Sequence, residues 1–266
     1  MTRFILAALL AGAAAPALAQ AAPEDEPAIC TDRPSKANGT CTVPAGKVQL
    51  ETDLLNWTRT SSGGTRTDVI LHSSPTLKLG LTDRSEIQVN IVPYETVETR
   101  SGGVRDRIGG VGDLFVRFKQ RVTGAGSKVE VAFLPFVKIP TARRGIGNGE
   151  VEGGLSVPVD FKLAGGTTLT FGPELDLLLD QDGSGRHLNV VNVVNLSHPL
   201  TGKLTLMGEL WGDQDLDPAG TSEQYSADVA LTYAAGKTLQ LDAGANFGLN
   251  RNTPDAQVYV GLSTRL

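Results

Sequence analysis

Three histidines are the side chains that come nearest to catalytic or metal-binding chemistry. His72, His187 and His198 could each act as a general base or bind a metal ion. No Glu-x-x-His or similar spacing links them. Ser197 precedes His198, but neighbours along an extended strand point to opposite faces, so they do not form a nucleophile and its base. We therefore predict no catalytic residue and no metal site, and we keep an outer-membrane hydrolase only as a remote alternative.

The glycine run Gly109-Gly110-Val111-Gly112 is the one stretch that resembles a phosphate-binding loop. A dinucleotide site needs a strand, a glycine turn and then a helix, whereas these glycines open a strand. We therefore predict no cofactor. The net charge is −5, and no basic run with interleaved aromatic residues is present, which argues against a nucleic-acid partner.

The N-terminus has the features of an export signal. Arg3 supplies a positive charge, residues 4–15 are apolar, and Ala17-Leu18-Ala19 is a small-x-small cleavage site. The alternative, a single membrane anchor, is disfavoured because the apolar run is short and is broken by Pro16. We predict that residues 1–19 form a signal peptide.

Cys30 and Cys41 are the only cysteines, and export places them in an oxidising compartment. A metal site needs more ligands than two cysteines, and no histidine lies near them. We predict that they form a disulfide. It lies in an extended leader, residues 20–46, which contains four prolines and which we expect to remain in the periplasm.

From residue 47 to residue 266 the pattern is that of strands. Apolar residues recur at every second position in about twelve segments, and we find no helical period. Alternate positions along a strand face the same side of the sheet, and we call each such set of positions a parity. The parity that carries the apolar residues contains no Asp, Glu, Lys or Arg, whereas the opposite parity contains many. A charge that faces lipid at mid-depth costs about 2–4 kcal/mol, so lipid contact explains this asymmetry. At the apolar parity, the first strand carries Val48, Leu50, Thr52 and Leu54, and the last carries Val258, Val260, Leu262, Thr264 and Leu266.

The connections alternate between short turns and longer polar links, such as those at 95–109 and 141–149. This layout is typical of outer-membrane barrels. Because lipid tolerates no open sheet edge, the last strand must pair with the first. The sequence therefore predicts an all-β protein, a transmembrane antiparallel β-barrel. The N-terminus and the C-terminus of the barrel are both expected on the periplasmic side. Its expected partners are outer-membrane lipid and the barrel-assembly machinery.

Two features complicate the strand assignment. Pro75, Pro135, Pro158 and Pro173 fall inside strands, where each removes a hydrogen-bond donor, so we expect bulges that can reverse the parity beyond them. The eighth strand, around residues 188–196, is also irregular, because valines occupy both of its faces.

Aromatic residues fall on the inward parity near the loop side. They could form a stacking surface for an apolar or aromatic solute. Alternatively, they pack the interior, or belong to the interfacial belt if a bulge has shifted the parity. The inward charges are of mixed sign, which fits either a packed polar interior or a weakly selective pore. The candidate lining residues are Trp57, Tyr94, Phe115, Phe136 and Trp211.

Several motifs carry a resemblance to a known family. They are Thr31-Asp32-Arg33-Pro34, the stretch 43–51, Gly110-Val111-Gly112-Asp113-Leu114 followed by Arg117 and Lys119, and Leu134-Pro135 with the glycine-rich loop 145–154. In this order the chain resembles the outer-membrane proteins named after the MetA pathway of phenol degradation, which are usually described as transporters. The two cysteines and the final Leu266, where such barrels often end in an aromatic residue, depart from this pattern.

The resemblance implies a barrel that passes small, aromatic or hydrophobic, compounds across the outer membrane. Our first hypothesis is accordingly a passive channel or transporter, and not an enzyme. The second is a structural or interaction barrel with a filled lumen and no transport. A lumen that is open would favour the first hypothesis, and a packed lumen would favour the second.

Overall fold

A computed structural model describes residues 27–266. The predicted signal peptide and the first residues of the leader lie outside this range. Within it, no helix is long and apolar enough to cross a membrane.

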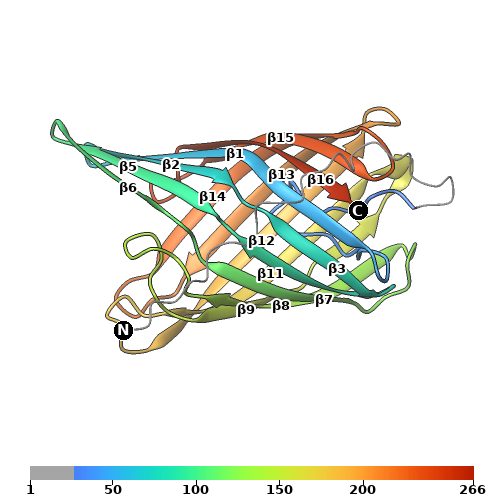
Figure 1. Cartoon of the computed structure of the whole chain (residues 1–266), viewed down its shortest axis with the longest axis horizontal. Helices are drawn as coiled ribbons and strands as arrows, with labels where there is room; N and C mark the ends of the chain where they lie inside the picture. The colour runs from blue at the N-terminus through green and yellow to red at the C-terminus, as the bar shows by residue number, and fades with distance from the viewer. Residues whose placement is uncertain (1–26) are drawn as a thin grey trace, which may run out of the picture.

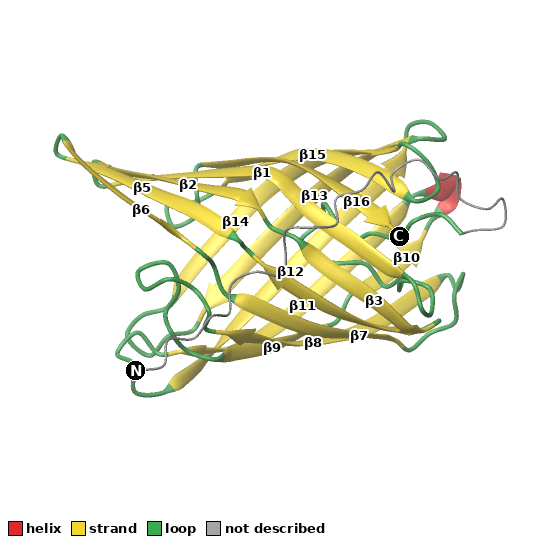
Figure 2. Ribbon diagram, viewed as in Figure 1, coloured by secondary structure: helices red, strands yellow, loops and turns green. Residues whose placement is uncertain are grey.

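The described chain consists almost entirely of antiparallel strands (Figures 1 and 2). The strand segments are β1 (Val48–Ser62), β2 (Thr65–Ser73), β3 (Thr76–Thr82), β4 (Ser85–Ile91), β5 (Tyr94–Ser101), β6 (Val104–Gly110), β7 (Leu114–Arg121), β8 (Val129–Ile139), β9 (Glu152–Ser156), β10 (Val159–Lys162), β11 (Thr168–Leu179), β12 (Arg186–Pro199), β13 (Leu204–Asp215), β14 (Ser222–Ala234), β15 (Leu239–Gly248) and β16 (Ala256–Arg265), with a short 3-10 turn at Ala164–Gly166.

These segments form one closed barrel. Four strands are each interrupted once, giving the pairs β2/β3, β4/β5, β6/β7 and β9/β10, so the sixteen segments make twelve strands. The barrel closes where β16 pairs with β1, from Gln49 opposite Arg265 to Arg59 opposite Ala256. The predicted twelve-stranded antiparallel barrel is therefore confirmed.

The interruptions agree only in part with the predicted proline positions. Pro75 separates β2 from β3 and Pro158 separates β9 from β10, as expected for residues without an N–H donor. Pro135 and Pro173, in contrast, lie within the continuous strands β8 and β11. Pro93 supplies a break between β4 and β5 that we did not predict.

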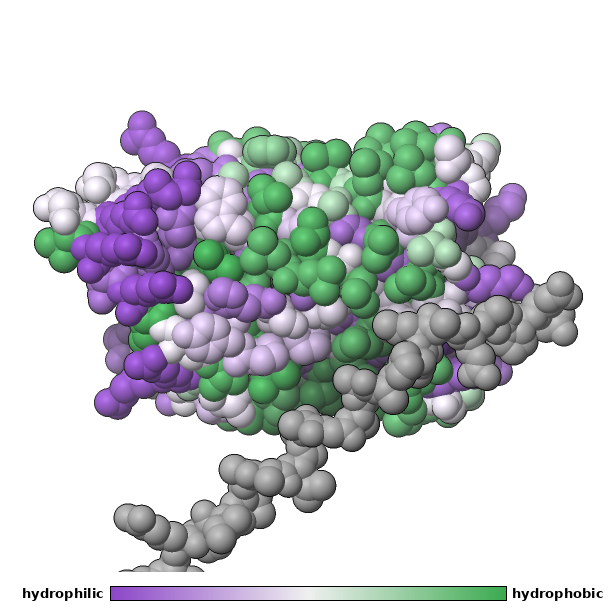
Figure 3. Space-filling model, turned by 45° about the horizontal axis from the view of Figure 1, so that its top comes forward, coloured by the Kyte–Doolittle hydropathy of each residue, from purple (hydrophilic) through white to green (hydrophobic). Residues whose placement is uncertain are grey.

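The barrel is apolar outside and polar inside. Leu188 and Leu210 are 51% and 59% exposed on the outer wall, whereas Lys78 and Lys119 are buried in the interior. β12 follows the same rule, so its assignment holds despite its irregular pattern. Figure 3 shows the apolar surface across the middle of the wall and hydrophilic side chains at the end from which β5 and β6 project. Such a band is what a barrel wall in contact with lipid requires.

The described part of the leader does not lie in the periplasm as we expected. Residues 27–46, hereafter the plug, run inside the barrel near the end at which β16 finishes (Figure 1). The plug carries charged and polar groups that pair with the inward side chains of the wall, whereas the periplasm would offer them only water. This pairing was invisible in the sequence because its partners are up to 238 residues away.

Candidate functional site: the plugged lumen

A buried ion cluster anchors the middle of the plug. Asp32 accepts hydrogen bonds from the ammonium groups of Lys78 and Lys119, which are 2% and 0% exposed. Glu51 and Glu86 flank the same ammonium groups. Burial alone would raise the pKa of Asp32, but the two lysines outweigh it and hold that pKa well below its usual range. Asp32 is therefore a carboxylate inside the lumen.

A second anchor lies next to the first in the sequence. The Arg33 guanidinium is 2.8 Å from Asp53 of β1 and 2.8 Å from Asp242 of β15. It also lies against Gly261, where an added Cβ would come within 2.1 Å of a guanidinium nitrogen. The glycine thus makes room for this side chain, and the plug is joined to the strands on both sides of the barrel closure.

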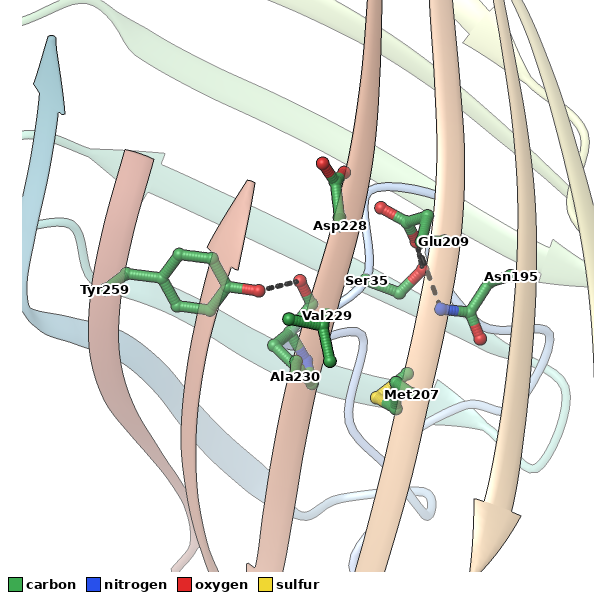
Figure 4. A pocket seen from close by; sticks show the side chains of 9 residues that line it. Ser35, Asn195, Met207, Glu209, Asp228, Val229, Ala230 and Tyr259 are labelled. Atoms are coloured by element: carbon green, nitrogen blue, oxygen red, sulfur yellow. Dashed lines mark hydrogen bonds between the residues drawn. The ribbon is translucent and has the colours of Figure 1, made fainter. Parts of the chain in front are cut away.

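The third anchor involves β13, β14 and β16, which lie beside β15 in the sheet (Figure 4). Ser35 donates a hydrogen bond to Glu209 of β13, which also accepts one from Asn195 over 3.2 Å. Lys36 forms an ion pair with Asp228 of β14 at 2.8 Å. Tyr259 of β16 donates to the Pro34 carbonyl over 3.4 Å. Only a small space of about 10 Å³ remains here, so this part of the lumen is packed.

The C-terminal half of the plug is held in the same way. Thr40 contacts Glu130 and Asp160 at 3.0 and 2.7 Å, and the Val43 amide donates to Glu86. Cys30 and Cys41 form a disulfide with their Cα atoms 6.1 Å apart, which joins the two halves of the plug. Contacts with strands around the barrel therefore hold the plug across the half of the lumen nearest the end of β16.

Above the plug, toward the long loops, the lumen opens into a cavity of about 510 Å³. Phe115 of β7 and Phe136 of β8 face it with their ring centres 6.4 Å apart, and Trp211 of β13 faces it from the other wall. A second space of about 220 Å³ shares Lys36 and Trp211 with the first. The structure thus brings together three of the five aromatic residues that the sequence placed in the lumen.

Trp57 and Tyr94 do not belong to this group, and their predicted lumenal position is wrong. A bulge between Asp53 and Leu55 reverses the parity of β1, so Trp57 pairs with the outward-facing Val258. The break at Pro93 has the same effect on Tyr94, which is 50% exposed. Both rings lie on the outer face of the barrel.

Aliphatic side chains that sequence reasoning missed complete the apolar part of the cavity. Leu134 and Val193 are each 1% exposed and line it together with Val191. The sequence did contain a signal for this apolar lining. In the eighth predicted strand, valines occupy positions of the parity that is polar in the other strands. An apolar residue at a position that should face water indicates a locally apolar lumen.

The polar part of the cavity carries more negative than positive charge. Lys138 is paired with Glu152 at 2.6 Å, and Lys36 is paired with Asp228. Among the described lining residues, this leaves three carboxylates and one guanidinium. They are Glu174, Asp176 and Asp213, on β11 and β13, and Arg117, on β7.

Asn189 of β12 links two of these carboxylates. Its amide donates to Asp176 over 3.3 Å and to Asp213 over 2.8 Å. The second carboxylate oxygen of Asp176 is buried and has no hydrogen-bond partner among residues 27–266. This wall therefore retains capacity to accept hydrogen bonds or positive charge from a solute.

The three histidines lie apart from one another. His198 contacts Thr167 at 2.7 Å near a short turn, and His72 lies 5.5 Å from the Tyr94 ring. His187 is surrounded by acidic groups at the loop end of the lumen. Its ring nitrogens are 2.9 Å from Asp180 and 2.7 Å from Asp215, and Asp217 is also close. The acidic partners of His187 were not expected from the sequence, because they come from β13 and from the loops after β11 and β13.

The closed barrel, its apolar outer wall and its polar lumen define a protein of the outer membrane. The chain belongs to the family described as "Putative MetA-pathway of phenol degradation", which matches residues 31–266. The resemblance found in the sequence is thereby confirmed. No curated protein sequence matches the chain.

Solved structures with the same fold are outer-membrane barrels. An outer membrane channel from Pseudomonas putida F1 is 13% identical, with a TM-score of 0.69 over 85% of this chain and 98% of that one. The NanC porin is 8% identical, with a TM-score of 0.53 over 83% of this chain and 100% of its own. The translocator domain of the autotransporter NalP from Neisseria meningitidis is 17% identical, with a TM-score of 0.52 over 87% of this chain and 90% of that one. At these identities the likeness concerns the fold.

Proposed function

We propose that this protein is a passive outer-membrane channel for small aromatic or hydrophobic molecules. The observation that carries the proposal is the lumenal cavity lined by Phe115, Phe136 and Trp211. A cavity of about 510 Å³ is within the range of small-molecule sites. The likeness to a channel and a porin supports the same class of function.

The cavity suits passage better than storage. An aromatic face contributes about 0.5–1.5 kcal/mol beyond area burial, so a few such contacts hold a solute only weakly. Weak binding favours release, which conduction requires. Passage further requires that the solute move past the plug, either along its edge or when part of it shifts.

The plug also supports the second hypothesis, a barrel with a filled lumen and no transport. Its anchors at Asp32, Arg33 and Lys36 join it to strands on opposite sides of the barrel. Flux into proteoliposomes distinguishes the two functions. A channel passes a neutral solute such as benzyl alcohol faster than protein-free vesicles do, whereas a filled barrel gives equal rates.

The route to the membrane is part of the same proposal. Residues 1–19 would be removed on export, and the barrel-assembly machinery would insert residues 47–266. Mass spectrometry of the protein from isolated outer membranes tests the first point, since the mature chain should begin at Gln20.

A further inference from the structure

A group of five arginines lies on one face of the part of the barrel that projects beyond the rest of the wall. This projection, hereafter the flap, consists of the end of β1 with β2, β5 and β6 (Figures 1 and 2). Strand pairing sets Arg66 opposite Arg100, and Arg100 opposite Arg105, in one row. Directly opposed residues share a face of the sheet, so the three guanidinium groups lie on one side of the flap.

The next row adds two more arginines to the same face. In it Arg59 is opposite Asp68, Asp68 is opposite Glu98, and Glu98 is opposite Arg107. Five arginines thus accompany two carboxylates, which leaves three positive charges in excess.

The two carboxylates are already engaged by four of the arginines. Asp68 lies 2.9 Å from Arg59 and 2.8 Å from Arg66, and Glu98 contacts Arg100 and Arg105. Among the described residues, no ion pair or hydrogen bond involves the Arg107 side chain. Each guanidinium has five N–H donors, so all five arginines keep donors for another anion.

This arginine face continues the lipid-facing wall. The next row toward the middle of the barrel consists of Trp57, Ile70 and Thr96. Trp57 in turn pairs with Val258, which faces outward. The arginines therefore lie immediately beyond the apolar band. They are accessible there, since the side chains of Arg100 and Arg105 are 49% and 58% exposed.

The opposite face of the flap is in contact with the loop that follows β8. Gly145, in the loop after β8, lies against Ile108, and Arg143 of that loop donates to the Gly109 carbonyl. The outer rim on other strands carries exposed leucines, with Leu210 59%, Leu216 43% and Leu249 61% exposed. The two arginine rows therefore lie on the outer face of the flap.

We propose that this face binds the phosphate groups of the outer-leaflet glycolipid. The loop end of an outer-membrane barrel faces that leaflet, whose phosphates lie just beyond the hydrocarbon. Arginine suits this ligand because its planar fork matches phosphate oxygens in a bidentate manner. Neighbouring strands are about 4.8 Å apart, so two or three guanidinium groups can reach one phosphate.

Binding of purified protein to lipid A, a bisphosphorylated glycolipid, tests the proposal. The variant R100Q/R105Q/R107Q leaves the wall and the lumen unchanged, and R84Q/R144Q/R251Q removes three exposed arginines elsewhere. Both must retain heat-modifiable gel mobility. We expect the wild type and the control to bind lipid A at least tenfold more tightly than the flap variant, as measured by native mass spectrometry.

Two further arms identify the ligand group. Dephosphorylated lipid A should bind the wild type no better than it binds the flap variant, and millimolar inorganic phosphate should leave lipid A bound. The proposal is overturned if the flap variant binds lipid A as well as the wild type, if dephosphorylation has no effect, or if inorganic phosphate displaces the lipid, which would indicate a site for free anions.

Discussion

The Lys36 ammonium lies 4.7 Å from the centre of the Trp211 ring. Lys36 belongs to the plug. Trp211 belongs to the barrel wall and lines both lumenal spaces. A cation over an aromatic face is attracted by about 0.5–2 kcal/mol, depending on desolvation. The position of the plug is thus linked to the shape of the cavity above it, and any movement of the plug alters both spaces.

The buried cluster at Asp32 should control the plug. Asp32→Asn removes one partner of a buried ion cluster, which we expect to weaken plug docking by about 3 kcal/mol. The strands keep their own ladder, so the barrel should remain folded and heat-modifiable. Single-channel recording in planar bilayers should show larger conductance than in the wild type. Asp182→Asn, in an exposed loop, is the matched control, and equal conductance in all three proteins would refute a role for Asp32.

The same cluster predicts a pH dependence. The pKa of Asp32 is lowered by Lys119 and Lys78 from its usual value of 3.8. Its contribution to plug docking is therefore complete above pH 3.8 and is lost as the pH falls toward the lowered pKa. Conductance should be constant from pH 7 to about pH 5 and should rise only in stronger acid. A rise that begins near pH 6 would point to a different group.

The disulfide should stabilise the plug but not the barrel. Closing a loop between residues eleven positions apart contributes about 2–3 kcal/mol at most. In C30S/C41S, trypsin should cleave after Lys36 faster than in the wild type, while the thermal unfolding of the barrel is unchanged. Reductant should accelerate cleavage in the wild type and have no effect on the double variant. Cleavage at the same rate in both proteins would contradict this role.

The charge of the cavity predicts a preference for cations. Glu174, Asp176 and Asp213 outnumber Arg117 in the lining, and charged rings or walls select ions of opposite sign. Under a potassium chloride gradient, the reversal potential should indicate cation selectivity, and D176N/D213N should reduce it. Anion selectivity in the wild type, or no change in the variant, would be inconsistent with the lining described.

The barrel could be predicted because lipid contact affects every strand in the same way. A charge at mid-depth is costly, so the outward positions across the middle of the wall are free of charge, and the pattern is visible without any long-range information. Phe115, Phe136 and Trp211 were placed correctly because β7, β8 and β13 keep their parity up to these residues.

The plug and the two misplaced aromatic residues could not be predicted in the same way. A bulge at Leu54 depends on how β1 meets β16, and it moves Trp57 to the outer face. The plug depends on pairs such as Arg33 with Asp242, whose members are 209 residues apart and have no common periodicity. Parity describes a strand locally, whereas these features result from contacts across the barrel.

The most direct test of the channel function compares aromatic residues inside and outside the lumen. The variant F115A/F136A/W211A removes the lumenal rings, and W57A/Y94A removes two rings from the outer face as a matched control. Flux of benzyl alcohol into proteoliposomes is the measurement. We predict that the lumenal variant alters the wild-type rate about tenfold, which corresponds to about 1.4 kcal/mol, and that the control leaves the rate unchanged. Equal rates for the wild type, the lumenal variant and protein-free vesicles would show that such solutes do not pass through this barrel.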